Sequence, residues 1–195
     1  MTTSTSTSVI YIPDISGFSK FVNDIEILHG QEITAELLEE IINAEELGFE
    51  ISEIEGDAVL FYKIGDPIPI EEIYNQSLKI LQKFHKKKME VQEKRICQCN
   101  ACQSVNNLTL KFILHFDNIE LINVSRFKKL YGKGVILAHR LMKNDVKENE
   151  YIIFTKNYPN SDKTNKEIFE VCPIKQNLEG IGDVDCQYIK LNLPN

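Results

Sequence analysis

Hydrophobic residues follow two different periods along the chain, and the change from one period to the other separates the predicted elements. Val9–Ile12 is a short β-branched and aromatic run, which predicts a strand that ends at Pro13 and Asp14. From Phe18 to Leu47 the apolar residues recur at helical spacing, and Gly30 predicts a break between two helical pieces. The N-terminal part of the chain is therefore expected to be a strand followed by helix.

The next segment changes to period two. Apolar and polar residues alternate over residues 49–54 and an apolar run follows at Ala58–Tyr62, so a hairpin that turns at Glu55 and Gly56 is predicted. Ile70–Arg95 returns to helical spacing and is expected to be a second long helix. Two strands and a helix therefore follow the first helical segment.

The C-terminal half is predicted from the same two periods. Lys86–Lys88, near the end of the second long helix, is a run of like charges and is expected to face solvent. Residues 127–134 contain two glycines and are expected to form a loop. The remaining predicted elements are strands at Leu108–Phe116 and Ile119–Val124 that form a hairpin, a helix at Val135–Met142, and strands at Tyr151–Thr155, Ile168–Val171 and Gln187–Leu191.

This order of elements predicts an α+β fold with a ferredoxin-like βαββαβ core, in which helices cover one face of an antiparallel sheet. Connections of the usual handedness place the first and third strands side by side and antiparallel. Asp14, at the end of the first strand, is then expected to lie beside Asp57, at the start of the third. Because the sequence shows no internal repeat and no linker, we expect a flexible tail at residues 1–8 and a single domain at 9–195.

Composition and charge narrow the class of protein. The 195 residues are 43% hydrophobic and 26% charged, which is ordinary for a globular domain. The formal net charge of -7 repels phosphate backbones and anionic lipids, so neither nucleic acid nor a membrane is an expected partner. The N-terminal segment lacks the basic start and the apolar run of a secretory signal, and we expect a cytoplasmic protein.

Two carboxylates at neighbouring strand ends form a suitable site for a hard cation such as Mg²⁺, which takes a few oxygen ligands and completes its shell with water and phosphate oxygens. Asp14 directly precedes a predicted helix start, where the backbone N–H groups of residues 15–18 would face an anion. Asp14 and Asp57 therefore suggest a metal and triphosphate site. The alternative is that Asp14 caps the helix and Asp57 serves the turn, which are both common uses of aspartate.

Five segments of the chain resemble the class III nucleotidyl cyclases. YIPDISGFSKF is similar to the opening motif of that family, and SEIEGDAVLFY is similar to its central hairpin, whose turn carries a glycine and an aspartate. LKFILHF, LYGKGVILAHRLM and LEGIGDVDCQYIKL are similar to its fourth strand, its third helix and its closing strands. The segments occur in the family's order between Val9 and Leu191, and the CxCxxC loop together with AHRLMKND resembles a bacterial branch of the superfamily.

The resemblance implies a signalling homodimer that uses Mg²⁺ or Mn²⁺ to convert a nucleoside triphosphate into a 3′,5′-cyclic nucleotide and pyrophosphate, at sites shared between the two chains. Asp14 and Asp57 match the family's two metal carboxylates, and the carbonyl of Ile15 matches its backbone ligand. Gly17 and Phe18, at the helix start beside them, are the expected substrate-binding positions.

Other positions match the family only in part. Arg140 matches the arginine that stabilises the transition state, with a surface ion pair as its alternative role. Glu53 falls on the purine-selecting position, where the family uses lysine for adenine and glutamate for guanine; a strand residue that faces water is the alternative. Three positions depart from the family: the ribose-orienting asparagine is replaced by Ile136, the second base-selecting residue by Lys129, and the late phosphate-binding lysine by Ile181. Lys129 or Lys133 is the alternative for the phosphate-binding role.

These departures leave two hypotheses of different classes. The first is an active but atypical cyclase that orients its nucleotide with other residues. The second is a catalytically degenerate nucleotide-binding or regulatory module of the same fold, because the loss of two polar contacts that each contribute about 10²–10³ in rate leaves little turnover. A metal-dependent nuclease or phosphatase is a third, since two acids alone fit many phosphoryl reactions.

Three closely spaced cysteines form a separate candidate site. Cys97, Cys99 and Cys102 are spaced so that three thiolates can bind one soft ion such as Zn²⁺. Reduced, partly buried thiols are the alternative, and they are the expected state in a reducing compartment. The candidates for a fourth zinc ligand are Cys172, Cys186, His85 and His115.

Overall fold

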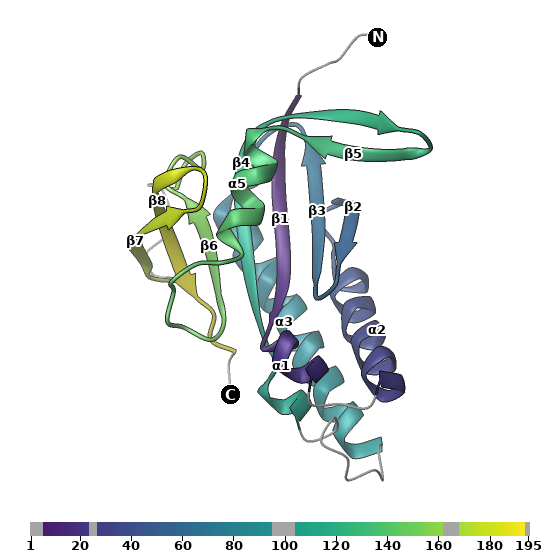
Figure 1. The fold of residues 1–195 in the computed structure, drawn as a ribbon. Helices are drawn as coiled ribbons and strands as arrows, with labels where there is room; N and C mark the ends of the chain where they lie inside the picture. The colour runs from purple at the N-terminus through teal and green to yellow at the C-terminus, as the bar shows by residue number, and fades with distance from the viewer. Residues whose placement is uncertain (1–5, 24–26, 95–103, 162–167, 194–195) are drawn as a thin grey trace.

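The computed structural model describes residues 6–23, 27–94, 104–161 and 168–193 (Figure 1). Its central element is an eight-stranded sheet in which seven strands follow the order β2-β3-β1-β4-β6-β8-β7 and β5 pairs with β4. The strands are β1 (Ser6–Ser16), β2 (Glu50–Glu55), β3 (Ala58–Ile64), β4 (Thr109–Val124), β5 (Phe127–Tyr131), β6 (Tyr151–Thr155), β7 (Val171–Leu178) and β8 (Gly182–Lys190). The helices are α1 (Phe18–Asn23), α2 (Ile27–Asn43), α3 (Ile70–Lys94), the short 3₁₀ helix η1 (Val105–Asn107) and α5 (Lys133–Leu141).

The strands β2, β3, β1 and β4 form the expected ferredoxin-like core. β1 pairs antiparallel with β3 on one side and with β4 on the other. β2 and β3 form the predicted hairpin, and β6 lies parallel to β4 and extends the sheet toward the β7–β8 hairpin. The predicted antiparallel pairing of the first and third strands is therefore confirmed.

Helices cover both faces of this sheet. Successive residues of a strand point to opposite faces, and alternate residues of β1 accordingly enter two different cores. Val9 and Tyr11 pack in the larger core with α2 and α3, whereas Ile10 and Ile12 pack in the smaller core with α5. Figure 1 shows α5 in front of β1 and β4, with α3 behind them. The expectation of helices on one face holds for the ferredoxin-like core, while α5 covers the second face.

The N-terminal elements differ from the prediction at their ends. β1 begins at Ser6 and continues through Pro13 and Asp14, because a central strand is held by partners on both sides. The predicted break at Gly30 is wrong, since Gly30 lies inside α2 and the two helical pieces are α1 and α2. An internal glycine costs about 1 kcal/mol, which the tertiary packing of an amphipathic helix outweighs.

Two strand predictions in the C-terminal half are wrong. Ile119–Val124 continues β4, and its hairpin partner is β5 at Phe127–Tyr131, where the glycine content predicts a loop. β5 is mostly exposed, so it shows no apolar alternation that would reveal it. β7 forms at Val171–Leu178 rather than at Ile168–Val171, because its position is set by its pairing with β8.

The long helix α3 corrects a third prediction. Within its lysine run, Lys88 is buried rather than solvent-facing, and its Nζ donates to the carbonyls of Asn106, at 3.1 Å, and Leu108. Burial lowers the pKa of Lys88. Lys88 thus donates hydrogen bonds to backbone carbonyls next to η1.

Among the helices of the described residues, none combines the length and the apolar character needed to cross a membrane.

Candidate functional site

Four residues form a row across the sheet beneath α5. The strand register aligns Lys111 on β4 with Asp14 on β1, and Asp14 with Ala58 on β3. Ala58 is in turn aligned with Glu55 on β2. Ala58 belongs to the core that packs against α5, so the side chains of this row lie on the α5 face. The row places two acids and one lysine on one face, with about 4.8 Å between neighbouring strands.

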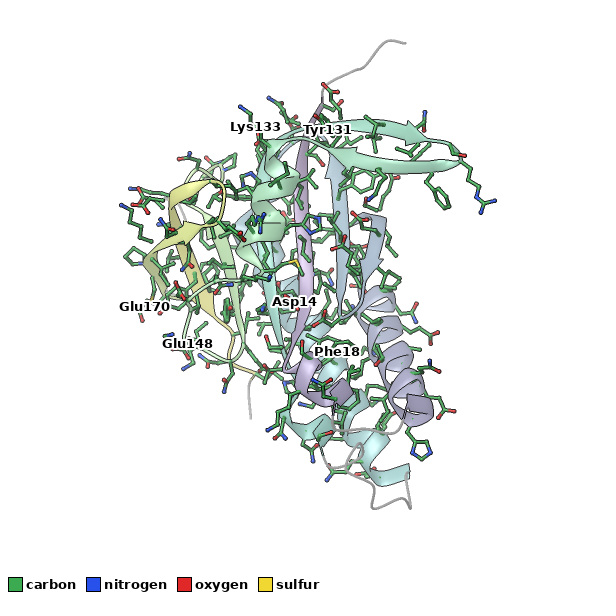
Figure 2. The ribbon with its side chains drawn as sticks, in the orientation of Figure 1. Asp14, Phe18, Tyr131, Lys133, Glu148 and Glu170 are labelled. Carbon is green, nitrogen blue, oxygen red and sulfur yellow. The ribbon has the colours of Figure 1, made fainter. Side chains whose placement is uncertain are left out.

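Asp57 joins this row from the turn between β2 and β3. The N–H of Ile15 donates to the carbonyl of Asp57 at 3.0 Å, which holds the turn against the end of β1. Gly56, at φ 60°, supplies the left-handed backbone conformation of the turn. Figure 2 shows Asp14 near the end of β1 that leads into α1, with Phe18 below it. The structure therefore brings Asp14 and Asp57 together, and their charges interact.

Asp14 is buried and Asp57 is half-buried, and Lys111 lies beside them. Asp14 is 5% exposed, and Nζ of Lys111 lies 3.2 Å from its Oδ2. Burial raises the pKa of Asp14, and the charge of Asp57 adds to that rise, while Lys111 opposes it. Burial also raises the pKa of Asp57, against a backbone hydrogen bond and the charge of Lys111. Two carboxylates facing one ammonium group leave a net negative charge, which favours an additional cation.

At the predicted anion site near the start of α1, the N–H group of Ile15 has a partner within the protein. The N–H of Ile15 is already bonded to the carbonyl of Asp57, so the expectation that it faces an anion is wrong. β1 extends one residue beyond Ile15, and α1 begins only at Phe18. Gly17 joins the two elements at φ 86°, a conformation that L side chains rarely adopt. Gly17 therefore has a clear role in the backbone turn between strand and helix.

The side chain of Phe18 lies in an apolar groove between α1 and α2. Its ring is 6.1 Å from that of Phe21, measured between centroids, and it packs against the larger core. The groove has a volume of about 490 Å³ and is lined by Phe18, Val22, Leu38 and neighbouring residues of α2. The larger core occupies the face of the sheet opposite α5. The Phe18 side chain is thus separated from the acid pair by the sheet.

Arg140 is held by a contact within its own chain. It lies in the last turn of α5, and its Nη1 is 2.9 Å from Oε2 of Glu179 in the turn between β7 and β8. The Arg140 side chain is 42% exposed and that of Glu179 is 85% exposed. The guanidinium therefore contacts the β7–β8 turn. The charged groups that shift the pKa of Asp14 are Lys111 and Asp57.

The two predicted base-selecting positions are neighbours in the structure. Oε2 of Glu53 on β2 lies 3.4 Å from Nζ of Lys129 on β5. The predicted alternative, that Glu53 only faces water, is wrong, because its side chain is 23% exposed and paired. Ile136 and Ile181, which replace the family's asparagine and late lysine, are both exposed apolar side chains. The structure thus brings Glu53 and Lys129 together. At Ile136 and Ile181 the side chain offers no polar group to a nucleotide.

Sequence analysis missed Lys111, which is the cation at the acid pair. The signal was present in the LKFILHF segment, where alternation places Lys111 on the same strand face as the buried Ile113. A lysine on the inner face of a buried strand needs a carboxylate partner, because an unpaired buried charge is costly. Only the register between β1 and β4 identifies that partner as Asp14.

The predicted zinc ligands of the CxCxxC loop, Cys97, Cys99 and Cys102, lie outside the described residues. Two candidates for the fourth ligand already have other partners. Nε2 of His85 is 2.6 Å from Oε1 of Glu150, and Nδ1 of His115 is 2.9 Å from the hydroxyl of Thr155. Burial lowers the pKa of His115. The structure therefore assigns both histidines to protein contacts.

The family of the chain follows from its sequence. Residues 34–151, which include Asp57, Lys111 and Arg140, match the model of the family described as protein of unknown function (DUF2652). The chain belongs to this family. A relative of the DUF2652 chain is the Uncharacterized protein Rv2561/Rv2562 of Mycobacterium tuberculosis, with 30% identity over 158 residues, which cover 80% of this chain and 73% of the relative.

Solved cyclase structures share the fold of the DUF2652 chain. The adenylyl cyclase CyaB from P. aeruginosa matches with a TM-score of 0.66 at 14% identity, over 98% of this chain and 97% of that one. The catalytic core of a rhodopsin-guanylyl cyclase with converted specificity, in complex with ATPαS, matches with a TM-score of 0.67 at 15% identity, over 97% of this chain and 98% of that one. The guanylate cyclase domain of RhGC from Catenaria anguillulae in complex with GTP matches with a TM-score of 0.61 at 13% identity, over 96% and 97%. The resemblance to the class III nucleotidyl cyclase superfamily is thus confirmed for the fold.

Proposed function

We propose that this protein binds a divalent cation and a nucleoside triphosphate at the Asp14–Asp57 pair and, as a homodimer, forms a 3′,5′-cyclic nucleotide and pyrophosphate. The observation that carries this proposal is the pairing of buried Asp14 with half-buried Asp57 beside Lys111, at the strand ends of a cyclase-like sheet. Two structures of the same fold contain ATPαS and GTP, which supports a purine nucleoside triphosphate as the ligand class.

The residues of the pair fit Mg²⁺ or Mn²⁺, because they offer oxygen donors in a region of net negative charge. The carboxylates of Asp14 and Asp57 and the carbonyl of Ile15 would hold the ion. When bound, the cation favours deprotonation of the ribose 3′-hydroxyl and offsets the charge of the phosphates. Lys111, whose Nζ is 3.2 Å from Asp14, is proposed to donate to a phosphate oxygen at the same site.

Arg140 is proposed to act on the nucleotide held by the partner subunit. Its pair with Glu179 is exposed, and such pairs contribute little stability, so a phosphate group can displace the carboxylate. The guanidinium can donate to two phosphate oxygens at once and stabilises the charge that develops in the transition state. Exposed apolar side chains on β5 and α5, among them Phe127, Tyr131 and Ile136, provide a surface for the second copy.

Glu53 and Lys129 are proposed to bind the purine base. A glutamate accepts hydrogen bonds from the N1–H and the exocyclic amino group of guanine, and a lysine donates to its O6. Adenine presents the opposite pattern at N1, where it has an acceptor and no hydrogen. The pair at 3.4 Å therefore favours guanine, and the proposed preferred substrate is GTP.

The test is to incubate purified full-length protein with Mn²⁺ and each of the four ribonucleoside triphosphates and to quantify cyclic nucleotide and pyrophosphate by mass spectrometry. We expect cyclic GMP as the main product and its loss in Asp57→Asn. Asp183→Asn, which removes an exposed carboxylate on β8, serves as the matched control and should retain activity.

Two other results would redirect the interpretation. A rise in melting temperature that requires both Mn²⁺ and nucleotide, without any product, would replace the cyclase by the catalytically degenerate binding module. The absence of both product and nucleotide-dependent stabilisation would overturn the proposal altogether.

A further inference from the structure

A second cluster of ligand-type side chains lies on the α5 face, at the edge strand of the sheet. Glu53 and Glu55 are two residues apart on β2, so both side chains point to that face. His139 reaches them from the last turn of α5. One ligand atom from each of the three residues lies within 4.8 Å of the other two. We propose that these three residues, here named the edge site, bind a transition-metal ion such as Zn²⁺.

Two of the three ligand atoms already have the separation of a metal centre. Nδ1 of His139 lies 3.3 Å from Oε2 of Glu55. With bonds of about 2.0–2.2 Å, two ligands of a tetrahedral Zn²⁺ are roughly 3.3–3.5 Å apart. An N–H···O hydrogen bond is typically shorter, at about 2.9–3.0 Å. A carboxylate oxygen of Glu53, within 4.8 Å of the other two ligand atoms, would be the third protein ligand, and water would take the fourth position of a bound ion.

The charges at the edge site also favour a doubly charged ion. The side chain of Glu53 is 23% exposed and that of Glu55 is 45% exposed, so solvent screens the repulsion between the two glutamates only in part. Lys129, 3.4 Å from Glu53, supplies one positive charge against two carboxylates. A divalent ion would offset the negative charges of both carboxylates. An imidazole nitrogen in the set favours Zn²⁺ over Mg²⁺, which takes oxygen ligands.

The edge site differs from the Asp14–Asp57 pair in position and in donor type. It shares Glu53 with the proposed base-binding pair, so a bound ion and guanine would compete for that carboxylate. In the row across the sheet, Glu55 on β2 is separated from Asp14 on β1 by Ala58 of the intervening strand β3. The acid pair offers only oxygen donors, whereas the edge site contains an imidazole. Zinc binding at the edge site is measured without nucleotide, so the result does not depend on whether the protein has the proposed cyclase activity.

The experiment uses the full chain with Cys97, Cys99 and Cys102 replaced by serine, which removes the thiolates of the CxCxxC loop. Equilibrium dialysis against Zn²⁺ followed by elemental analysis gives the stoichiometry and affinity, and Co²⁺ absorption reports the coordination geometry. We expect one ion per chain with a tetrahedral Co²⁺ spectrum.

Substitution of a direct ligand should weaken zinc binding more than substitution of a residue elsewhere in the chain. His139→Ala and Glu55→Gln are expected to weaken zinc binding by about 100-fold or more, because the loss of an outer-shell partner alone costs roughly 10–100-fold. His29→Ala, which removes a histidine of α2 on the opposite side of the sheet, is the matched control and should bind normally. Circular dichroism and melting temperature establish that each variant is folded.

Three results would overturn the edge site. They are the absence of zinc binding in the serine background, unchanged affinity in a folded His139→Ala variant, and loss of binding in the Asp14→Asn/Asp57→Asn double variant. The last result would assign the ion to the acid pair. Retention of binding in that double variant, together with its loss in His139→Ala, supports the proposal.

Discussion

Replacement of Lys111 by methionine removes the positive charge that lies against Asp14, and it should strongly destabilise the fold. Nζ of Lys111 is 3.2 Å from Oδ2 of Asp14, and at this distance two unit charges interact by about 5 kcal/mol in an effective dielectric constant of about 20. The side chains are 17% and 8% exposed, so solvent screens them little. Loss of one partner of such a pair costs about 3–5 kcal/mol.

The destabilisation should depend on pH in a defined direction. Burial raises the folded-state pKa of Asp14 above its unfolded value, and Lys111 limits that rise. A carboxyl group with a raised folded pKa gives its full stabilisation below the unfolded pKa and loses it as pH rises through the folded pKa. Removal of Lys111 raises the folded pKa further. Lys111→Met should therefore cost most at pH 7 and less at pH 5, where the carboxyl group of Asp14 binds a proton more readily.

The assay is urea denaturation in the presence of EDTA at pH 7 and pH 5, which gives the free energy of unfolding of each variant. Lys86→Met, which removes a lysine with a 68% exposed side chain on α3, is the control and should have little effect. The double variant Asp14→Asn/Lys111→Met should recover much of the loss, because the buried side chain at position 14 then carries no charge. A loss below about 1 kcal/mol for Lys111→Met, equal at both pH values, would refute a buried, unscreened ion pair.

Three further predictions concern the proposed reaction. Arg140→Ala and Asp57→Asn should each lower product formation by about 10²–10³-fold, whereas a mixture of the two variants should regain activity, because one subunit of the mixed dimer supplies the intact pair and the other the arginine. No regain in cyclic nucleotide assays of the mixture would contradict a site shared between subunits. The charge reversal of Glu53→Lys with Lys129→Asp should shift product formation from GTP to ATP, measured as the ratio of the two kcat/KM values, and an unchanged ratio would show that the pair does not read the base. Glu179→Gln should lower the KM for nucleotide severalfold by releasing the guanidinium, and a raised KM would instead show that the carboxylate orients Arg140 productively.

The elements of the ferredoxin-like core could be predicted from local sequence, because each one has its own periodic set of apolar residues that it buries. The alternation before and after Gly56 predicts the β2–β3 hairpin, and the helical spacing of residues 70–95 predicts α3. The right-handed connection rule then places Asp14 beside Asp57 without knowledge of any side-chain contact. The acid pair was predictable for this reason, since it depends on topology alone.

The tertiary structure decided the features that depend on a distant partner. β5 is exposed along most of its length and forms because it pairs with the extended end of β4, which leaves no local signal. Lys88 looks like an ordinary surface lysine in sequence, and alternation gives the strand face of Lys111 without its partner. Register and packing bury Lys111 against Asp14 and Lys88 against carbonyls near η1. The approach of His139 to Glu55 likewise needs α5 to pack on the second face of the sheet. Periodicity reports which side of an element is apolar, whereas the identity of the group that meets a charged side chain is set by strand register and helix placement, which involve residues far apart in the chain.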